Sequence, residues 1–166
     1  FVGGGLVLNG NLYSGPSGNA AALASIPMPD GQQLIDRASL LQLEARIIAL
    51  GAEPTTLWKS PSAWSEYNES VQEWIREAAP AIAIAALSGV ALLELDGIII
   101  DGAMPKQVRS DLVKAVQQCL ATMNNEGLGE FECVAGQLAS DARALGSAAM
   151  PLLVSFSPNH ESLLKS

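Results

Sequence analysis

Three consecutive glycines near the start of the chain are the first residues that could hold a ligand. Gly3, Gly4 and Gly5 stand between apolar residues in the stretch FVGGGLVL. Because glycine has no side chain, its backbone lets a phosphate or another chain segment approach closely, and successive amides can point at an anion. A bulge in a β-hairpin would use the same residues for a purely structural purpose. The pattern alone leaves both interpretations open.

A turn of small residues, Asp101-Gly102-Ala103, is the second candidate. It follows the apolar run at residues 98–100. Open α/β sheets bind ligands outside the carboxyl ends of their strands, which is where this turn would lie. A carboxylate inside a phosphate site would repel the ligand, however, and Asp101 could instead cap the loop that follows it.

The third candidate is the stretch 18–28, with the sequence GNAAALASIPM. It predicts a loop of small residues that leads into an extended segment. No acid–base pair, nucleophile triad or Walker-type lysine can be assembled around it. The residues alone therefore lead only as far as a ligand-binding α/β half-domain.

Metal chemistry is excluded by the residue types that would supply the ligands. The chain has one histidine, His160, and two cysteines, Cys119 and Cys133, without C-x-x-C spacing. One His and two separated Cys cannot form a Cys/His zinc site. We expect both cysteines to be buried, reduced thiols rather than a disulfide.

The composition describes an ordered domain without a basic surface. Of the 166 residues 49% are apolar, the net charge is −8, and the nine Lys and Arg residues are scattered. Phosphate contact depends on clustered basic residues, so any DNA binding by the full protein must lie elsewhere. The longest apolar stretch, 78–93, is shorter than the ~20 residues that span a bilayer, and no signal peptide precedes it. We therefore expect a cytoplasmic domain with no membrane partner.

The elements that must position these residues begin with a hairpin over residues 1–13. Asn9-Gly10 supplies the positive-φ pair of a type I′ turn. The chain starts without Met, directly in a strand-like run, so we expect a fragment of a longer protein. The free edge of the hairpin is then expected to pair with another copy or with residues before Phe1. A short strand is predicted near 25–28.

Helices follow in the middle of the chain. Ser39 as N-cap and Gly51 as stop predict a helix between them, whereas 52–60 predicts an irregular connector. A long helical region covers 61–93, in which Pro80 must introduce a kink or start a second helix.

The last third of the described pattern alternates strands and helices. The β-branched run 98–100 predicts a buried central strand, and Pro105 starts a helix that reaches about residue 123. A second strand is predicted at 131–135, and Ser140 caps a last helix. This order predicts an α/β fold with a parallel sheet and helical crossovers.

These stretches resemble the ROK family (repressors, open reading frames, kinases) of the actin/hexokinase-type ATPase superfamily. VGGGLVLNGNLYSG is similar to the family's phosphate-loop hairpin, and 18–28 to the segment that usually reads G-x-A-G-E-x-G-H-x-P. IIIDGAMPKQVRSDLVKAV is similar to the strand, turn and helix near the nucleotide's adenosine, and 142–153 to the terminal helix. The resemblance covers nearly the whole chain. It implies one ROK C-terminal domain over residues 1–166, the C-terminal half of a ribonuclease H-like or actin-like ATPase fold.

The departures from the family pattern fall at its sugar and zinc positions. The resemblance implies a sugar-site-like segment that includes Gly18 and Asn19. It places Ala22 and Ser25 where the family has the Glu and His that contact sugar hydroxyls, the His also binding zinc. Losing two charge-assisted hydrogen bonds would weaken a ligand by about two to four orders of magnitude.

The zinc knuckle of the family is replaced by 29–39, PDGQQLIDRAS, which has no cysteine. The Glu that closes the knuckle falls at Ile35, although a shift of one residue offers Asp36. In the adenosine loop, the usual G-G-G becomes Asp101-Gly102-Ala103. The resemblance therefore implies a divergent member without zinc or another cofactor.

These changes favour a regulator over an enzyme. We expect the sugar-sensing or sugar-phosphate-sensing and dimerisation domain of a ROK-type transcriptional regulator, which binds DNA only through a missing N-terminal domain. It is expected to be a homodimer and to hold no catalytic residue, because the family's catalytic Asp belongs to the half before Phe1. One alternative is a sugar kinase that phosphorylates a hexose or amino sugar with ATP-Mg. The other is a pseudo-enzyme scaffold that binds neither ligand.

Overall fold

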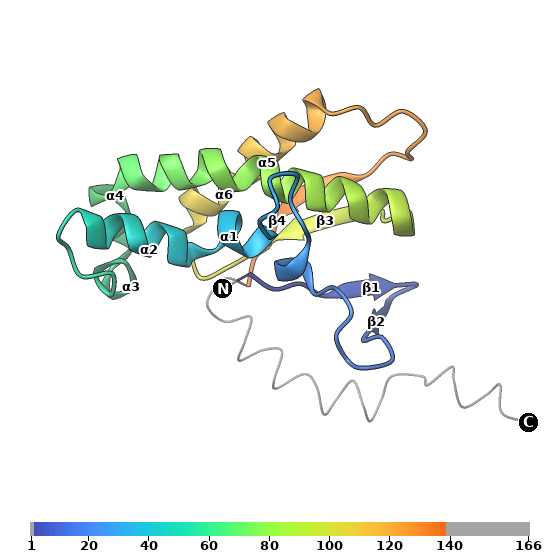
Figure 1. Ribbon diagram of the computed structural model, residues 1–166, viewed down its shortest axis with the longest axis horizontal. Helices are drawn as coiled ribbons and strands as arrows, with labels where there is room; N and C mark the ends of the chain where they lie inside the picture. Colours follow the sequence, from blue (N-terminus) through green and yellow to red (C-terminus); the bar gives the residue numbers. More distant parts are fainter. Residues whose placement is uncertain (1, 139–166) are drawn as a thin grey trace, which may run out of the picture.

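The computed structural model describes residues 2–138 of the chain. It has the expected α/β character, with helices on one long core helix and strands in two small sheets (Figure 1). The predicted last helix from Ser140, the stretch 142–153 and His160 lie outside the described residues.

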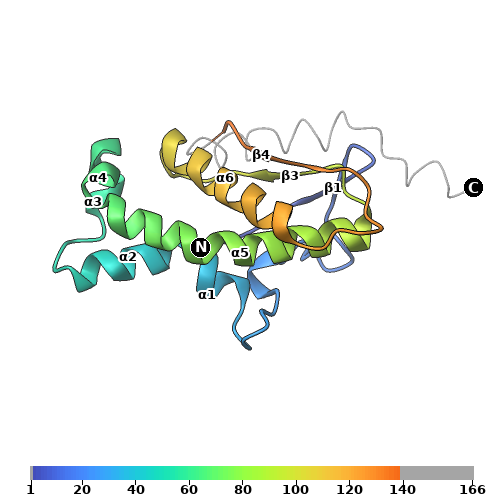
Figure 2. The same cartoon turned by 90° about the horizontal axis from the view of Figure 1, so that it is seen from above.

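Helix α5, Asn68–Leu93, runs along the long axis of the molecule (Figure 1). Helices α1, Leu34–Ala38, and α2, Leu40–Ala49, pack on one side of it, and α6, Lys106–Thr122, packs on the other (Figure 2). By length and composition alone, α5 is the one helix in the described part of the chain that could cross a membrane. Its packing against the neighbouring helices is that of a core helix, as the sequence predicts.

The buried face of α5 is built mainly from alanine. Ala78 and Ala83 have no exposed surface, and Ala79, Ala81, Ala85 and Ala86 are also buried. Small side chains let the neighbouring helices approach closely, so that a single helix can be covered on several sides. The larger Trp74 fills the space beside them and is 1% exposed.

Of the two alternatives that the sequence left open at Pro80, a kink or the start of a second helix, the second is wrong. The helix continues from Asn68 to Leu93 with Pro80 inside it, on the exposed side. Water can reach the carbonyl that loses its amide partner at this place, which lowers the cost of the proline. The chain breaks earlier instead, at Tyr67, between α4, Pro61–Glu66, and α5.

Two short helices were not predicted. The connector 52–60 contains α3, Thr56–Lys59, and the indole of Trp64 on α4 donates to the carbonyl of Leu57 at 2.8 Å. Helix α1 begins after Gln33, whose amide donates to Asp36 Oδ2 at 2.9 Å. The predicted cap of α2 is present, since Ser39 Oγ accepts from the amide of Leu41 at 3.2 Å.

The hairpin forms as predicted. Strands β1, Leu6–Leu8, and β2, Asn11–Tyr13, are antiparallel, and the turn residues Asn9 and Gly10 have φ of 51° and 76°. The predicted strand near 25–28 is instead a short 3-10 helix, η1, Leu23–Ser25, followed by one isolated bridge of Pro27. Among residues 2–138 no third strand pairs with the hairpin, so the pairing of its edge stays a prediction.

Strands β3, Gly97–Ile100, and β4, Glu132–Ala135, are parallel neighbours that α6 connects. This unit confirms the predicted strand, helix and strand. The expectation of a buried central strand is wrong for the described residues, because β3 has a single partner strand and Ile99 is 72% exposed. The apolar run thus predicted the strand correctly but not its burial.

A longer side chain on the buried face of α5 tests this packing. Replacing Ala78 with Leu is expected to lower the free energy of unfolding by about 1–3 kcal/mol, because the surrounding helices must move apart. Ala91, which is exposed on the same helix, provides the matched control: Ala91→Leu should change stability by less than about 0.5 kcal/mol. Urea denaturation of both variants gives the comparison, and equal effects would contradict the packing described.

Candidate functional site

Gly4 lies against the loop that resembles the sugar segment. A Cβ atom built on Gly4 would be 2.5 Å from Leu23 Cδ1 and 3.0 Å from the carbonyl oxygen of Ala21. The glycine therefore permits the close approach of another chain segment. Gly3 has open space around it, and Gly5 meets only the Leu12 side chain at 4.0 Å. All three glycines are exposed and precede β1 rather than forming a bulge within it.

The loop between the hairpin and η1 is folded tightly on itself. The amide of Ala20 donates to the carbonyl of Ser14 at 2.9 Å, and the amide of Gly18 to that of Gly15 at 3.2 Å. Ala21 has φ of 58°, a conformation that a residue with a Cβ rarely adopts. Local strain of this kind is found more often at ligand sites than elsewhere.

The sugar-site-like residues lie in the loop before η1, on η1 itself and on α1, and the two helices are in contact. The amide of Leu34 at the start of α1 donates to the carbonyl of Ile26 just after η1, at 2.9 Å. Ala22, Ser25 and Asp36 are exposed, as are Gly18 and Asn19 in the preceding loop. The carboxylate of Asp36 accepts the amide of Gln33 at the amino end of α1 and so also has a structural role.

A second carboxylate in this region, Asp30, takes part in a hydrogen bond and an ion pair. It accepts the amide of Gln32 at 3.1 Å and forms an ion pair with Arg37 of α1. The amide of Gln32, followed by the guanidinium of Arg37, holds the pKa of Asp30 below its usual range. The loop around Asp30 is thus closed by an ion pair and by a hydrogen bond from a backbone amide.

Asp101 stands at the carboxyl end of β3 and joins three parts of the chain. Its Oδ1 accepts the amide of Gly102 at 2.8 Å and Nη1 of Arg109 at 2.7 Å. Its Oδ2 accepts the amide of Leu138 at 2.9 Å. The carboxylate therefore connects the turn after β3, helix α6 and the stretch after β4. Gly102 is half-buried and Ala103 is exposed.

Sequence reasoning missed Arg109, which is 6% exposed and also donates to the carbonyl of Gly102 at 3.3 Å. A signal was present: Arg109 precedes Leu112, Val113 and Val116 at steps of three, four and seven residues, so it shares their buried helix face. A charged residue at such a position requires a partner. The nearest preceding carboxylate in the sequence is Asp101.

Gly136 was also missed. A Cβ atom built on it would lie 2.4 Å from Asp101 Oδ2 and 2.6 Å from Asp101 Cβ. Any other residue at this position must displace the carboxylate. The amide of Gly136 donates to the carbonyl of Ile100 at 2.8 Å, which continues the pairing of β3 and β4 by one residue.

The structure thus forms two groups from the three candidate stretches. Gly4 lies with the loop and helices that carry Ala22, Ser25 and Asp36. Asp101 and Gly102 are held by α6 and by the stretch after β4. Among residues 2–138 no group of three or more His, Cys, Asp or Glu side chains could hold a metal ion.

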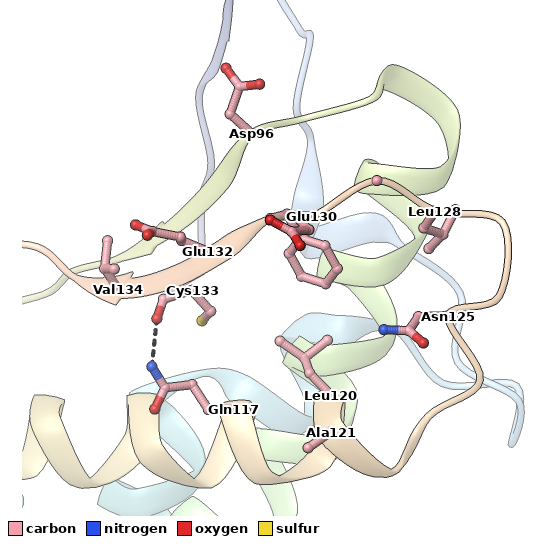
Figure 3. Close-up of a pocket in the computed structure, with 12 residues that line it drawn as sticks. Asp96, Gln117, Leu120, Ala121, Asn125, Leu128, Glu130, Glu132, Cys133 and Val134 are labelled. Atoms are coloured by element: carbon pink, nitrogen blue, oxygen red, sulfur yellow. Dashed lines mark hydrogen bonds between the residues drawn. The ribbon is translucent and has the colours of Figure 1, made fainter.

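A hollow of about 1110 Å³ lies at the other end of β3 and β4, between their amino ends and the last turns of α6 (Figure 3). Gln117 of α6 donates to the carbonyl of Cys133 at 2.7 Å beside it. Of the described residues that line it, Asp96, Glu130 and Glu132 are acidic and none is basic. The hollow is therefore unsuited to a phosphate, and it lies away from the candidate residues.

Both cysteines are free in the described part of the chain, and the expected burial is confirmed for Cys133 only. Cys133 on β4 is 7% exposed, whereas Cys119 on α6 is only half-buried. Burial raises the pKa of the Cys133 thiol. Cys133 therefore does not resemble an activated nucleophile.

Comparison with solved structures identifies the fold. The chain superposes on a ROK hexokinase from Thermus thermophilus with a TM-score of 0.62 and 20% identity, over 92% of this chain and 55% of the hexokinase. It is similar to a ROK family glucokinase from Streptomyces griseus, solved with glucose and AMPPNP, with a TM-score of 0.67 and 18% identity over 89% and 56% of the two chains. A ROK family protein from Streptococcus pneumoniae, solved with sucrose, gives a TM-score of 0.65 and 18% identity over 92% and 55%.

No protein-family profile and no curated protein sequence matches the chain. The structural likeness nevertheless shows that the chain has the α/β fold of part of these sugar kinases. The chain spans about half the length of the solved structures it matches.

The contact between Gly136 and Asp101 can be tested with paired glycine variants. Gly136→Ala is expected to lower the free energy of unfolding by about 1–3 kcal/mol, because the new methyl group must push the carboxylate away from its donors. Gly129 has no atom near the position of a Cβ, so Gly129→Ala is the control and should be nearly neutral. Thermal unfolding monitored by circular dichroism measures both, and a neutral Gly136→Ala would disprove the contact.

Proposed function

We propose that the chain is the effector-sensing and dimerisation domain of a transcriptional regulator of the ROK family, and that its effector is a sugar or a sugar phosphate. Two features together support this proposal, the fold of the chain and the residues at two positions near η1. The fold is that of ROK sugar kinases over about nine-tenths of the chain. By the resemblance, Ala22 and Ser25 stand where the family has its Glu and His, and both are exposed, Ala22 as the N-cap of η1 and Ser25 as its last residue.

Neutral residues at these positions suit a sensor better than a catalyst. The Ser25 hydroxyl and the Asn19 amide offer neutral hydrogen bonds to sugar hydroxyls, each worth about 0.5–1.5 kcal/mol, and Asp36 offers one carboxylate. A kinase must orient its sugar hydroxyl toward the phosphoryl group, which requires firm positioning. A regulator requires only that the sugar favour one state of the protein.

The charge of the chain assigns DNA binding to another part of the protein. A net charge of −8 and an absence of clustered basic residues in the sequence do not suit phosphate contact. A winged helix in the missing N-terminal part would supply it. Such a protein acts in the cytoplasm, where its DNA is.

An apolar surface on α2 and α3 supports dimerisation. Leu41 and Ile48 lie two turns apart on one face of α2 and are 44% and 57% exposed, with exposed Ala45 between them. Trp58 of α3 lies beside them, because its indole donates to Glu44 of α2 at 2.8 Å. The Trp58 side chain is 44% exposed. These four residues, Leu41, Ala45, Ile48 and Trp58, form the α2 patch. A second copy would remove this patch from water.

A sugar kinase is the second candidate, and one observation favours it. The Streptomyces griseus glucokinase that shares this fold was solved with glucose and a nucleotide analogue. If this chain belongs to a kinase, the full-length protein should phosphorylate glucose or glucosamine with ATP-Mg in a coupled assay. A pseudo-enzyme scaffold would bind neither the sugar nor ATP.

Sugar binding is tested by thermal shift of the full-length protein with glucose, glucosamine and their 6-phosphates. We expect at least one of them to raise Tm, since a ligand of the folded state stabilises it by mass action. Asn19→Ala and Ser25→Ala should each weaken the apparent affinity by roughly three- to tenfold. Ser65 is exposed on α4, away from the loop, and Ser65→Ala serves as the control. If no sugar shifts Tm, the sensor and kinase proposals both fail and the scaffold remains.

Dimerisation is tested by placing a charge on the α2 patch. Ile48→Glu in the full-length protein is expected to raise the dimer dissociation constant by about tenfold or more, because a carboxylate replaces apolar surface that the dimer would bury. Leu92 is 82% exposed on α5, and Leu92→Glu makes the same change of chemistry elsewhere. Light scattering after size exclusion measures the state of each variant. An unaltered dimer in Ile48→Glu would exclude the α2 patch as its interface.

A further inference from the structure

The donors around Asp101 are those of an anion site. Among the described residues they include two backbone amides from different loops, Gly102 and Leu138, and the guanidinium of Arg109. Backbone amides and a guanidinium that converge at the carboxyl end of a strand are a common way for α/β proteins to bind phosphate oxygens. In this chain the carboxylate of Asp101, which belongs to the same turn, accepts hydrogen bonds from these donors.

We propose that the carboxylate of Asp101 is a built-in anion that keeps phosphate-bearing ligands out of the turn after β3. The proposal deepens the proposed function and rests on it in one respect, because a sensor of this kind has no need for a nucleotide at this turn. The evidence for it is otherwise independent of the sugar site. It lies in the contacts of Asp101.

Tethering gives the carboxylate a decisive advantage over a free ligand. It is attached to the turn that it occupies, so it loses little freedom on binding, whereas a phosphate from solution must give up translational and rotational freedom. Its charge also neutralises Arg109. An incoming phosphate would therefore meet a carboxylate at short range and no uncompensated cation.

The space around the carboxylate fits it closely. Gly136 faces Asp101 without a side chain, and a single added methyl group would overlap Oδ2. The side chain of Arg109 is 7% exposed and that of Asp101 is 22% exposed. The carboxylate is thus more exposed than the guanidinium that it holds. Removal of Asp101 would open a site that contains two amides and a cation.

The test compares Asp101→Ala with Asp96→Ala in the full-length protein. Asp96 is exposed and lies just before β3, at the opposite end of the strand, so both variants lose one negative charge beside the same element. The probes are inorganic phosphate, ADP and glucose 6-phosphate, which distinguish a free anion, a nucleotide and a sugar phosphate. Tm and the amide NMR signals of Gly102 and Leu138 are measured against ligand concentration.

The wild type and Asp96→Ala are expected to show no saturable change of the Gly102 and Leu138 signals with any probe. Asp101→Ala should bind inorganic phosphate at these amides at least about tenfold more tightly than either of them, with a matching rise in Tm. If Asp101→Ala is unfolded without additives, formate or phosphate should restore its folding, because a free anion then takes the place of the missing carboxylate. Such rescue would support the proposal equally.

Two results would overturn it. One is phosphate or ADP binding at the Gly102 and Leu138 amides of the wild type, since the carboxylate would then exclude nothing. The other is an Asp101→Ala variant that neither binds nor is rescued by any anion, which would make Asp101 a structural ion-pair partner alone. Sugar binding read at Asn19 and Ser25 is unaffected by either result. Failure of this inference therefore remains distinguishable from failure of the proposed function.

Discussion

The small side chains on the buried face of α5 determine how the described residues can assemble. A helix that presents alanine to its neighbours can be approached closely on several sides, and α1, α2 and α6 all use this freedom. Trp74 supplies a directional contact in this core. Its indole donates to the carbonyl of Ser39 at 3.1 Å, the residue where α1 ends and α2 begins. The candidate sugar loop is attached to α1 and therefore takes its position from α5.

The second half of the molecule depends on a polar contact instead. Arg109 is too deeply buried to remain without a partner, and breaking a buried ion pair by removing one member costs about 3–5 kcal/mol. Asp101 accepts Nη1 of Arg109 and two backbone amides together. One carboxylate thus fixes the turn after β3 and the path of the chain after β4. The turn after β3, which could hold a ligand, therefore has a structural role.

Local signals in the sequence predicted the elements whose determinants are local. Asn9-Gly10 gives the hairpin turn, Ser39 caps α2, and the strand–helix–strand order gives the parallel pair β3 and β4. Helices α1 and α3 were missed because each is no more than five residues long and depends on tertiary contacts more than on its own pattern. The exposure of Ile99 was missed because an apolar run indicates that a strand tends to be buried. It does not indicate which part of the protein would bury it.

The candidate residues were located in the sequence by type, but their partners were not. The proximity of Gly4 to Leu23, and of Gly136 to Asp101, arises from segments that are distant along the chain. The second of these contacts has an evolutionary consequence. A side chain at position 136 and a carboxylate at position 101 exclude each other sterically, so neither position can drift freely while the other is fixed. In relatives of this protein the two should vary together, and a lineage that gained bulk at 136 would first have had to lose its aspartate.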